Sequence, residues 1–486
     1  MPHVVTQSCV GDGSCVYACP VNCIQPTPDH PAFEHAEMLH IDPAACVDCG
    51  ACVTACPVDA IKPHSWLDAG ERAFLAVNAA YHRGERTRPS LAPVRPPLRV
   101  RRHSRPLRVA IVGSGPAAIY AADEILTIPG AQVSVYERLP VPYGLVHAGV
   151  APDHRRTRRI ARQLDAICAD PRLRMHLGVE VGRDVSRERL LESHHAVIYA
   201  VGAAADRRLQ IPGAGLPGVA SATELVAWYN GHPDHAGRTF DLSHPRAVIV
   251  GNGNVALDVA RILTVDPESL VGTAIAPHAL DALRASRIEE VVVVGRRGPA
   301  ESAFTLPELI GLSATPGVDL AVEDDALADI PAGDPKLDLL RELSPASACD
   351  GARRIVLRYR LTPSRIDGTE RVTGIGLAPT ARAGGPATSI DAGLVITAIG
   401  YRGMPVAGMP FDEATGTIPN DDGRVIDPAT GAAVPGVYVV GWIKRGPTGF
   451  IGTNKSCSQD TVQVLVEDFN AGLLREPGVG VAQSAL

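Results

Sequence analysis

The stretch LRVAIVGSGPAAIYAADEIL (107–126) decides the fold of the larger part of this chain. It begins with RVAIV, a short apolar run typical of a buried strand, and ends in alanine-rich sequence typical of a helix. Between them, Gly113 can make a tight turn, Gly115 lets a phosphate approach the backbone, and the small Ala118 allows close helix packing. The stretch therefore predicts a strand, a dinucleotide-binding turn and a helix whose N-terminus faces a pyrophosphate.

The next strand strengthens that interpretation. It is VSVYE (133–137), and it ends in Glu137, roughly 20 residues beyond the turn, as the dinucleotide fingerprint requires. A carboxylate at this place accepts hydrogen bonds from ribose hydroxyls, as in sites for NAD or for the adenosine of FAD. The alternative is a glycine turn with a purely structural role.

A second unit of the same kind is PRAVIVGNGNVALDVARIL (245–263). The strand predicted after it, EEVVVVG (289–295), ends without an acid and continues as Arg296 and Arg297. Guanidinium groups clamp a 2′-phosphate, which a carboxylate would repel, so this unit should prefer NADP to NAD. The alternative for the two arginines is a solvated turn.

Alternating strands and helices continue from Leu107 to the C-terminus. They predict an α/β fold with two Rossmann-like dinucleotide-binding domains. A flavin paired with NADP(H) indicates hydride transfer between them, followed by single-electron steps to one-electron carriers.

Cysteines are crowded at the other end of the chain. Eight of the 11 fall within the first 56 residues, which favours metal binding over disulfides. The run Cys46-x2-Cys49-x2-Cys52-x3-Cys56-Pro matches the bacterial ferredoxin pattern. The run Cys9-x5-Cys15-x3-Cys19-Pro has the same outer spacing, with Asp12 where the full pattern has cysteine. We therefore expect a small α+β ferredoxin domain.

The fourth cysteine of each ferredoxin run ligates the other cluster. This rule assigns a [4Fe–4S] cluster to Cys46, Cys49, Cys52 and Cys19. Cys9, Cys15 and Cys56 then hold the second cluster. Three thiolates favour [3Fe–4S], and an Asp12-ligated [4Fe–4S] cluster is the alternative. Zinc fits the spacing poorly, and Cys23 is interpreted as a buried free thiol.

Composition excludes several classes of function. The formal net charge is −7, so the whole molecule does not read as a nucleic-acid binder. No apolar run is long enough to span a membrane, and the N-terminus lacks the signal-peptide pattern, so we expect a cytoplasmic protein. Residues 1–62 hold seven acids and one lysine, whereas residues 82–106 hold eight arginines interleaved with proline and read as a linker.

Four long segments carry a resemblance to a known family. They are PVPYGLVHAGVAPDH (140–154), GNGNVALDVARIL (251–263), RRGPAESAFTLPEL (296–309) and GWIKRGPTGFIGTNK (441–455). With them the chain resembles adrenodoxin-reductase-like ferredoxin–NADP reductases, in the bacterial form fused to an N-terminal seven-iron ferredoxin. The resemblance implies a three-layer FAD domain that is split by an inserted NADP domain.

The same resemblance divides the chain and assigns residues. The predicted divisions are a ferredoxin domain (1–65), a linker (66–106), the first segment of the FAD domain (107–210), an NADP domain (211–395) and the second segment of the FAD domain (396–486). The implied FAD contacts are Gly113, Gly115, Ala118, Glu137, Leu145, Val181, Trp442, Gly449, Phe450 and Ile451, with Gly449 also near the nicotinamide. The implied NADP contacts are Arg207, Asn252, Gly253, Asn254, Val255, Arg296, Arg297 and Glu308.

Other residues near these segments have more than one interpretation. His154 is a candidate catalytic residue for proton transfer or docking beside the flavin, and Asp258 is a second candidate. His147 stands where the family has arginine. Five arginines follow His154 and could dock the acidic ferredoxin surface, or they could form a solvated helix face. They are Arg155, Arg156, Arg158, Arg159 and Arg162.

The leading hypothesis is a ferredoxin–NADP reductase with a tethered ferredoxin. The resemblance implies external ferredoxins and downstream redox enzymes such as cytochromes P450 as partners. The alternative is an electron-input subunit of a larger assembly, since the small subunit of glutamate synthase has a similar architecture. A disulfide reductase is discounted, because no CxxC pair occurs after residue 56.

Overall fold

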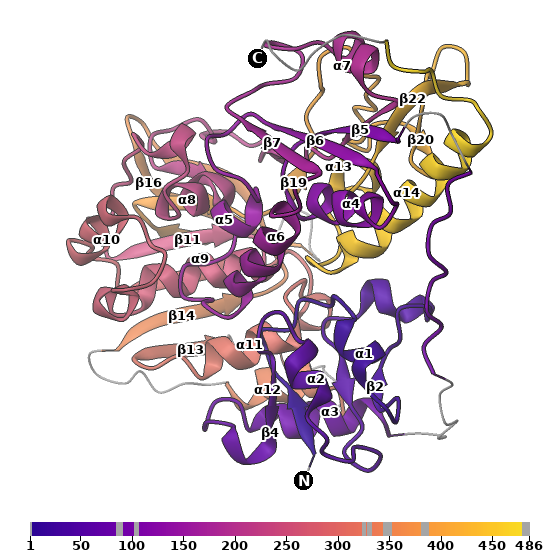
Figure 1. The fold of residues 1–486 in the computed structure, drawn as a ribbon. Coiled ribbons are helices and arrows are strands. Elements are labelled where there is room, and N and C mark those ends of the chain that lie inside the picture. Colours follow the sequence, from indigo (N-terminus) through magenta and orange to yellow (C-terminus); the bar gives the residue numbers. More distant parts are fainter. Residues whose placement is uncertain are drawn as a thin grey trace.

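The computed structural model shows three packed units (Figure 1). It describes residues 2–83, 91–101, 106–322, 327, 333–343, 352–380 and 388–478. The ferredoxin segment lies below two larger α/β units, and the chain from residue 91 to 101 runs upward beside it (Figure 1). No described helix is both long and apolar enough to cross a membrane.

The first α/β unit is built on a seven-stranded sheet in the order β20-β21-β22-β8-β5-β6-β7. Its strands are β5 (Arg108–Val112), β6 (Gln132–Glu137), β7 (Leu173–Leu177), β8 (Ala196–Tyr199), β20 (Asn420–Asp421), β21 (Arg424–Ile426) and β22 (Ala433–Val439). β22 pairs in parallel with β8, although more than 200 residues separate them in the sequence. The expectation of a sheet completed by the C-terminal segment of the chain is confirmed.

Two helices cover one face of this sheet. Helix α4 (Pro116–Leu126) follows the Gly113 turn, and α14 (Thr453–Asn470) packs on it. The hydroxyl of Ser458 on α14 donates to the carbonyl of Ala117 at 2.8 Å. Small residues on α4 allow this approach, because Ala118, Ala121 and Ala122 are all fully buried.

The second α/β unit is built on a six-stranded, all-parallel sheet in the order β10-β18-β11-β12-β14-β13. Its strands are β10 (Val219–Ser221), β11 (Arg246–Val250), β12 (Glu290–Val294), β13 (Val318–Val322), β14 (Arg353–Arg358) and β18 (Leu394–Thr397). Its helices are α8 (Ala222–Tyr229), α9 (Asn254–Thr264), α10 (Pro277–Arg284), α11 (Leu306–Ser313) and α12 (Pro335–Glu342).

An antiparallel sheet covers one face of the second unit. It consists of β15 (Leu361–Gly368), β16 (Val372–Pro379) and β17 (Thr388–Asp391). Its apolar side chains, among them Ile375 and Leu377, pack against Val248 and Val292 of the parallel sheet. The sequence patterns did not predict this sheet. The short bridge between β9 (Ala205–Asp206) and β19 (Tyr401–Arg402) pairs the two segments that connect the units.

The ferredoxin unit is an internal repeat. Helices α1 (Ser14–Ala18) and α2 (Ala51–Ala55) each follow a left-handed glycine, Gly13 at φ 75° and Gly50 at φ 77°. Each helix ends at a cysteine with nearly the same backbone angles. The two small antiparallel sheets are β1 (His3–Val5) with β4 (Ile61–Pro63), and β2 (Ile24–Gln25) with β3 (His40–Ile41). Equal local conformations explain why the two cysteine runs share their outer spacing.

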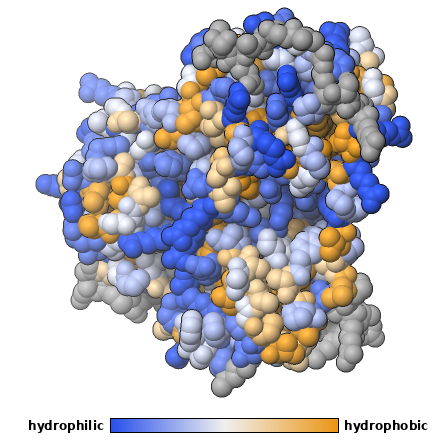
Figure 2. Space-filling view, viewed as in Figure 1, coloured by the Kyte–Doolittle hydropathy of each residue, from blue (hydrophilic) through white to orange (hydrophobic). Residues whose placement is uncertain are grey.

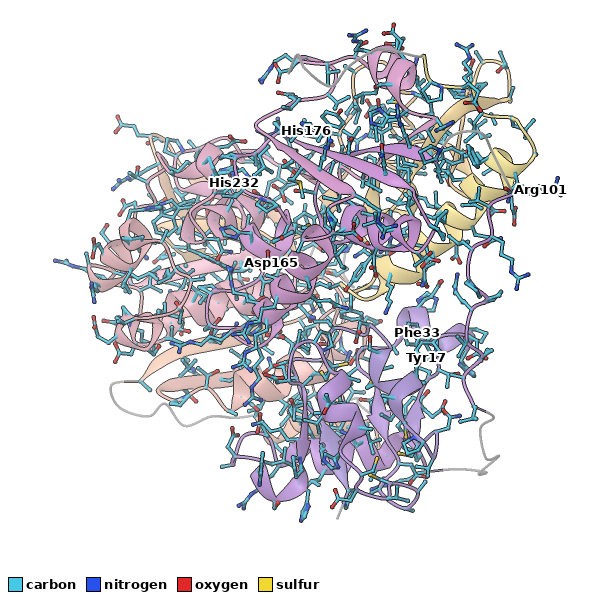
Figure 3. The ribbon with its side chains drawn as sticks, viewed as in Figure 1. Tyr17, Phe33, Arg101, Asp165, His176 and His232 are labelled. Atoms are coloured by element: carbon cyan, nitrogen blue, oxygen red, sulfur yellow. The ribbon has the colours of Figure 1, made fainter. Side chains whose placement is uncertain are left out.

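Side chains pack around the start of α1 in the ferredoxin unit. A Cβ at Gly13 would lie 3.2 Å from the ring of Phe33, so Phe33 covers the start of the helix. Figure 3 labels Phe33 and Tyr17 at this helix. Phe33 is buried, whereas Tyr17 is 44% exposed. Figure 2 shows apolar residues gathered on the surface of the ferredoxin unit.

Part of the segment assigned to the linker (66–106) is folded, and it precedes residues 82–106, where the extended stretch was expected. Helix α3 (Ala73–Tyr81) packs on the ferredoxin unit. Its Asn78 accepts from the backbone N–H groups of Val5 (3.2 Å) and Ile41 (2.9 Å), which joins two strands. The apolar sequence AFLAVNAAY buries Phe74, so this segment has a helical face of its own.

The remainder of the linker lies along α14. Residues 91–101 have no regular secondary structure. Arg95 pairs with Asp460 at 2.7 Å, and the N–H of Arg101, labelled beside α14 in Figure 3, donates to Asn470. The linker residues 84–90 and 102–105 lie outside the described residues of the chain. The exact domain boundaries stay predictions.

Candidate functional site

Four cysteines of the ferredoxin unit lie close together, and one of them, Cys49, is exposed. Burial, followed in order by the neighbouring thiols of Cys46, Cys19 and Cys49, raises the pKa of Cys52 to about 12. These are the four cysteines that the crossing rule groups together. Crowded thiols that resist ionisation alone become thiolates when a metal binds them, so this donor set fits an iron–sulfur cluster.

Three cysteines and an aspartate converge at the second position. Burial raises the pKa of Cys15 well above its usual range, and Cys9, Asp12 and Cys56 are the next largest causes. Burial likewise raises the pKa of Cys9 to about 11. Asp12 is 9% exposed and accepts a hydrogen bond from the Ser14 hydroxyl. The donors at this position therefore fit a cluster with three thiolates and a carboxylate nearby.

Cys23 is buried, as expected of a free thiol, but it is not isolated. Its sulfur lies 3.4 Å from the sulfur of Cys19, and Cys46 also contributes to its raised pKa after burial and Cys19. It is thus a fifth sulfur beside the four-cysteine site. The spacing x3 after Cys19 was the only signal of this position in the sequence.

The two glycine turns share one geometry. A Cβ at Gly113 would lie 2.6 Å from the carbonyl oxygen of Ala200, and a Cβ at Gly251 would lie 2.2 Å from that of Ala398. Both glycines also have positive φ, so the fold itself requires them. In contrast, a Cβ at Gly115 or Gly253 would meet nothing within 4 Å. The open space before each second glycine fits a pyrophosphate at the N-terminus of α4 and of α9.

Glu137 lies against the first turn. Its carboxylate accepts from the backbone N–H (3.0 Å) and the hydroxyl (2.6 Å) of Ser114, and from the N–H of Leu139 (2.8 Å). A carboxylate offers about four lone pairs, so it can still accept from a ribose hydroxyl. The turn and the acid that the sequence pairs are therefore brought together.

The second turn is supported by asparagines. The side chain of Asn254 accepts from the N–H of Thr305 at 2.8 Å, and the carbonyl of Asn252 accepts from the N–H of Phe304 at 2.9 Å. Val255 follows in the first turn of α9 and packs on the core of the unit. These bonds tie the turn to the segment that leads into α11.

Arg296 and Arg297 follow β12, whose parallel neighbour β11 leads into the Gly251 turn. The carboxyl ends of parallel neighbours meet at one sheet edge, which brings the arginines to the same edge as the turn. Both are exposed, and among the described residues neither guanidinium has a hydrogen-bond or ion-pair partner. Arg207 is also exposed, and its backbone N–H donates to Gly400.

The remaining predicted flavin contacts come from both segments of the first unit. Leu145 begins α5 (Leu145–Ala148) and is 36% exposed, whereas Val181 is 9% exposed and belongs to the core. Trp442 begins α13 (Trp442–Arg445), and its indole N–H donates to Thr448 at 3.0 Å. This bond closes the loop that carries Gly449, Phe450 and Ile451.

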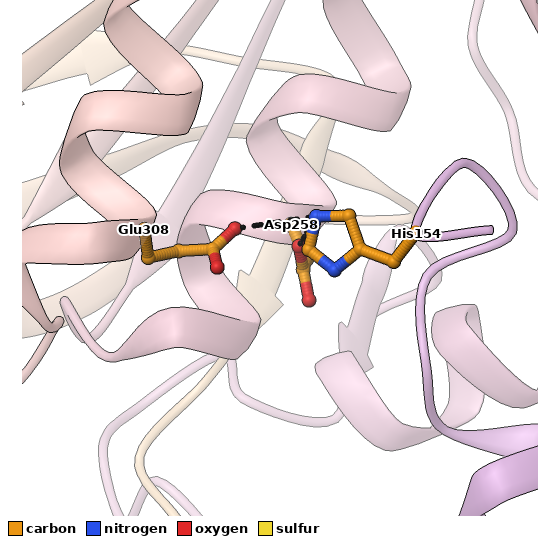
Figure 4. Close-up of side chains that lie close together, drawn as sticks. All are labelled: His154, Asp258 and Glu308. Carbon is orange, nitrogen blue, oxygen red and sulfur yellow. Dashed lines mark ion pairs between the residues drawn. The ribbon is translucent and has the colours of Figure 1, made fainter. Parts of the chain in front are cut away.

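His154 lies 3.7 Å from Asp258 and 3.5 Å from Glu308 (Figure 4). All three side chains also lie beside one buried arginine, Arg261. Arg261 pairs with Asp258 (2.6 Å), Asp153 (2.8 Å) and Glu308 (3.0 Å). A nitrogen of its guanidinium also lies 2.8 Å from Nε2 of His154. Because the guanidinium pairs with all three carboxylates, we interpret this cluster as an ion network rather than a metal site.

The pKa values of two carboxyl groups in this network shift in opposite directions. Burial raises the pKa of Asp258 to about 6, against the opposing effect of His154 and Arg261. Although burial acts against it, the pKa of Glu308 is lowered, chiefly by His154 and Arg261. Glu308 is 7% exposed and also accepts from Gln7 of the ferredoxin unit at 3.2 Å. Its predicted contact with NADP stays a prediction.

Comparison with known proteins agrees with a ferredoxin unit at the N-terminus and with nucleotide-binding units after it. Residues 8–60 match the family model described as 4Fe-4S dicluster domain, and residues 107–296 match that described as pyridine nucleotide-disulphide oxidoreductase. A probable ferredoxin/ferredoxin–NADP reductase of Mycobacterium tuberculosis is 57% identical over 493 residues, covering 98% of this chain and 85% of its own length.

This chain belongs to the ferredoxin/ferredoxin–NADP reductase family. The human mitochondrial NADPH:adrenodoxin oxidoreductase is 41% identical over 78% of this chain and 83% of its own length. The structure of M. tuberculosis FprA in complex with NADPH matches with a TM-score of 0.72 at 43% identity, over 76% of this chain and 87% of that one. The resemblance to adrenodoxin-reductase-like enzymes, the α/β fold class and the oxidoreductase class are thereby confirmed.

The arginine run of this reductase contacts its ferredoxin unit, as the charge pattern predicted. Arg156 pairs with Glu71 at 2.7 Å, and Arg159 pairs with Asp59. Arg158 instead donates to Asn230 at 2.5 Å, and Arg155 to the carbonyl of Val271. Two members of the run thus dock the ferredoxin, while two others tie this segment to the second unit.

Replacing both docking arginines, Arg156→Gln with Arg159→Gln, should weaken the salt dependence of electron transfer from the reductase to its ferredoxin. Exposed ion pairs contribute about 0–1 kcal/mol each and are screened by salt. Stopped-flow rates of NADPH-driven cluster reduction at increasing ionic strength measure this. Arg371→Gln, which breaks an exposed pair with Asp241 on the second unit, is the matched control. Equal salt slopes in all three proteins would contradict the prediction.

The two glycines of the first turn should respond differently to alanine. Gly115→Ala should fold within about 1 kcal/mol of the unaltered reductase, as for other helix N-caps, but should lose bound flavin. Gly113→Ala should lose about 1–3 kcal/mol of stability from backbone strain alone. Flavin absorbance per chain and urea unfolding separate the two effects. Full flavin content in Gly115→Ala would contradict the assignment of the open space to a pyrophosphate.

Proposed function

We propose that this chain is a self-contained ferredoxin–NADP reductase that exchanges electrons between NADPH and its own and external ferredoxins. The observation that carries the proposal is the docking of a ferredoxin with two cysteine sites against two α/β units that each carry an open dinucleotide turn. Bound FAD exchanges a hydride with NADP(H), and it exchanges electrons singly with iron–sulfur clusters.

Different residues of the chain are proposed to bind FAD and NADP. The Gly115 turn and the start of α4 hold the FAD pyrophosphate, and Glu137 accepts from the ribose. The Gly253 turn holds the NADP pyrophosphate, and Arg296 with Arg297 bind the 2′-phosphate that distinguishes NADP from NAD. Their exposed, unpartnered state among the described residues supports this role, because a ligand phosphate would give them a counter-charge.

His154 and Asp258 are proposed to transfer a proton beside the flavin. Nε2 of His154 lies 2.8 Å from the Arg261 guanidinium, and burial raises the pKa of the nearby Asp258 to about 6. His154 comes from the segment after α5 of the first unit and Asp258 from α9 of the second, and Arg261 contacts both. We therefore expect the binding and release of the nicotinamide nucleotide to be coupled to protonation at this junction.

The three-cysteine site is proposed to hold [3Fe–4S]. The engagement of Asp12 with Ser14 supports a carboxylate that lies beside the cluster rather than one that completes it. Electron paramagnetic resonance of the anaerobically purified, oxidised protein tests this, since a [3Fe–4S] cluster gives a near-isotropic signal. Its absence, with two reduced four-iron signals instead, would favour the Asp12-ligated alternative.

Purification of the chain alone tests the function. With FAD and clusters bound, it should reduce an added bacterial-type ferredoxin with NADPH, followed by cytochrome c as the reporter. Cytochromes P450 are proposed as further acceptors through such ferredoxins. The thiols needed for the clusters favour a reducing compartment such as the cytoplasm. Activity only after addition of a second subunit would instead favour the glutamate-synthase-type assembly, which the relatives do not support.

A further inference from the structure

The backbone of the ferredoxin lies directly on the loop that carries the proposed flavin contacts. The N–H of Gly452 donates to the carbonyl of Val10 at 2.8 Å. A Cβ at Gly452 would lie 2.1 Å from the oxygen of Gly11 and 2.4 Å from the nitrogen of Asp12. Gly452 has an ordinary φ of −66°, so its own conformation does not require glycine. Glycine is required at this position because the ferredoxin backbone at Gly11 and Asp12 approaches so closely.

Side chains of the three-cysteine site border the same junction. Cys9 and Cys56 pack against a mixed apolar cluster shared by the ferredoxin and the first α/β unit. The ferredoxin contributes Val10, Val58 and Ala60, and the reductase contributes Ile119, Tyr120, Tyr143, Val146, Ile160, Leu164 and Ile451. Two of the three thiols of this site therefore pack against the apolar cluster that joins the ferredoxin to the reductase.

The four-cysteine site has the opposite surroundings. Cys49 is exposed, and the residues next to its partners include Val47, which is 59% exposed, and Val21, which is 41% exposed. None of its cysteines belongs to the apolar cluster shared with the first unit among the described residues. The four-cysteine site therefore reaches solvent through Cys49, whereas the three-cysteine site borders the junction with the flavin loop.

We propose that the redox sites of this chain work in a fixed order, from the flavin site to the three-cysteine site and then to the four-cysteine site at the surface. The inference rests on the proposed function. The hydride of NADPH supplies two electrons. They leave the flavin site singly, and each transfer oxidises the donor site by one electron and reduces the next by one, with no bond made or broken. An external one-electron carrier protein, itself reduced by one electron, takes each electron from the surface site.

Helix α4 connects the first two sites. Its N-terminus lies at the Gly115 turn, and its Tyr120 is 2% exposed. The Tyr120 hydroxyl has no hydrogen-bond partner among the described residues, and Asp12 is the charged group that acts on it most strongly. A buried hydroxyl without a partner is unfavourable, so we assign this group to the surroundings of the three-cysteine cluster.

Single-site loss of each cluster tests the order in the full chain. Cys15→Ala removes a thiol of the three-cysteine site, and Cys46→Ala removes one of the four-cysteine site. Each variant is mixed anaerobically with NADPH and freeze-quenched, and the paramagnetic signal of its remaining cluster is followed in time. In Cys46→Ala, the three-cysteine cluster should be reduced as fast as in the unaltered chain. In Cys15→Ala, the four-cysteine cluster should be reduced by dithionite but lag behind the unaltered chain with NADPH.

Two outcomes would overturn the order. One is reduction of the four-cysteine cluster at the unaltered rate in Cys15→Ala, and the other is loss of NADPH-driven reduction of the three-cysteine cluster in Cys46→Ala. Bleaching of flavin absorbance by NADPH is recorded in the same samples. Absence of bleaching would count against the proposed function, so the two failures are distinguishable.

A milder variant tests the junction without removing a ligand. Tyr120→Phe should change the signal shape or midpoint potential of the three-cysteine cluster and leave those of the four-cysteine cluster unchanged. Tyr81→Phe alters an exposed tyrosine on α3 and serves as the control. A change confined to the four-cysteine cluster, or no change at either, would contradict the placement of Tyr120.

Discussion

Replacing Arg261 by leucine should lower the free energy of unfolding by about 3–5 kcal/mol, as expected when one partner of a buried ion pair is removed. The Arg261 side chain is 5% exposed and pairs with three carboxylates, on Asp153, Asp258 and Glu308. Without it, these groups remain buried close together with no fixed cation. They must then take up protons or separate, which loosens the junction between the units.

Urea midpoints of Arg261→Leu and the unaltered chain measure the loss. Arg371→Leu is the control, because Arg371 pairs with Asp241 at the surface, with 67% and 41% of the two side chains exposed. Such a pair contributes about 0–1 kcal/mol. A second signature is the pH dependence, since carboxylates without a counter-charge favour protonation and the Arg261→Leu defect should shrink as the pH falls. Equal midpoints for the two variants would show that the network is not structural.

The double replacement Arg296→Gln with Arg297→Gln should weaken NADPH binding by about ten- to hundredfold. A hydrogen bond to a charged group contributes about 1.5–3 kcal/mol, and each 1.4 kcal/mol corresponds to about tenfold in affinity. NADH lacks the 2′-phosphate, so its weaker binding should change little. The expected result is therefore a loss of preference rather than a loss of the reaction.

Anaerobic stopped-flow reduction of the flavin at varied NADPH and NADH concentrations measures both affinities. Arg371→Gln again serves as the control, because it removes an exposed arginine at the turn between β15 and β16. An equal loss for both nucleotides would assign the arginines to the pyrophosphate or to folding. No loss for either would leave them as solvated residues and contradict the assignment of the 2′-phosphate.

Local patterns were the most informative feature of the sequence. The glycine turn with Glu137, and the cysteine runs with their crossing rule, depend on spacings of a few residues or on one strand. The structure places the cysteines in the two groups that the rule predicts. The linker boundary at residue 66 missed α3, an apolar helix that precedes the Pro- and Arg-rich stretch 82–106 and buries Phe74 and Asn78.

The sequence by itself determined the fold class, the two nucleotide turns and the division of the cysteines, because each depends on chain geometry over short distances. Only the tertiary structure decided that Gly452 meets Val10, that Arg261 gathers acids from three segments and that Arg156 and Arg159 reach the ferredoxin. Such contacts join residues up to several hundred positions apart. They form because burying apolar surface between folded units brings together groups whose sequence spacing carries no trace of the pairing.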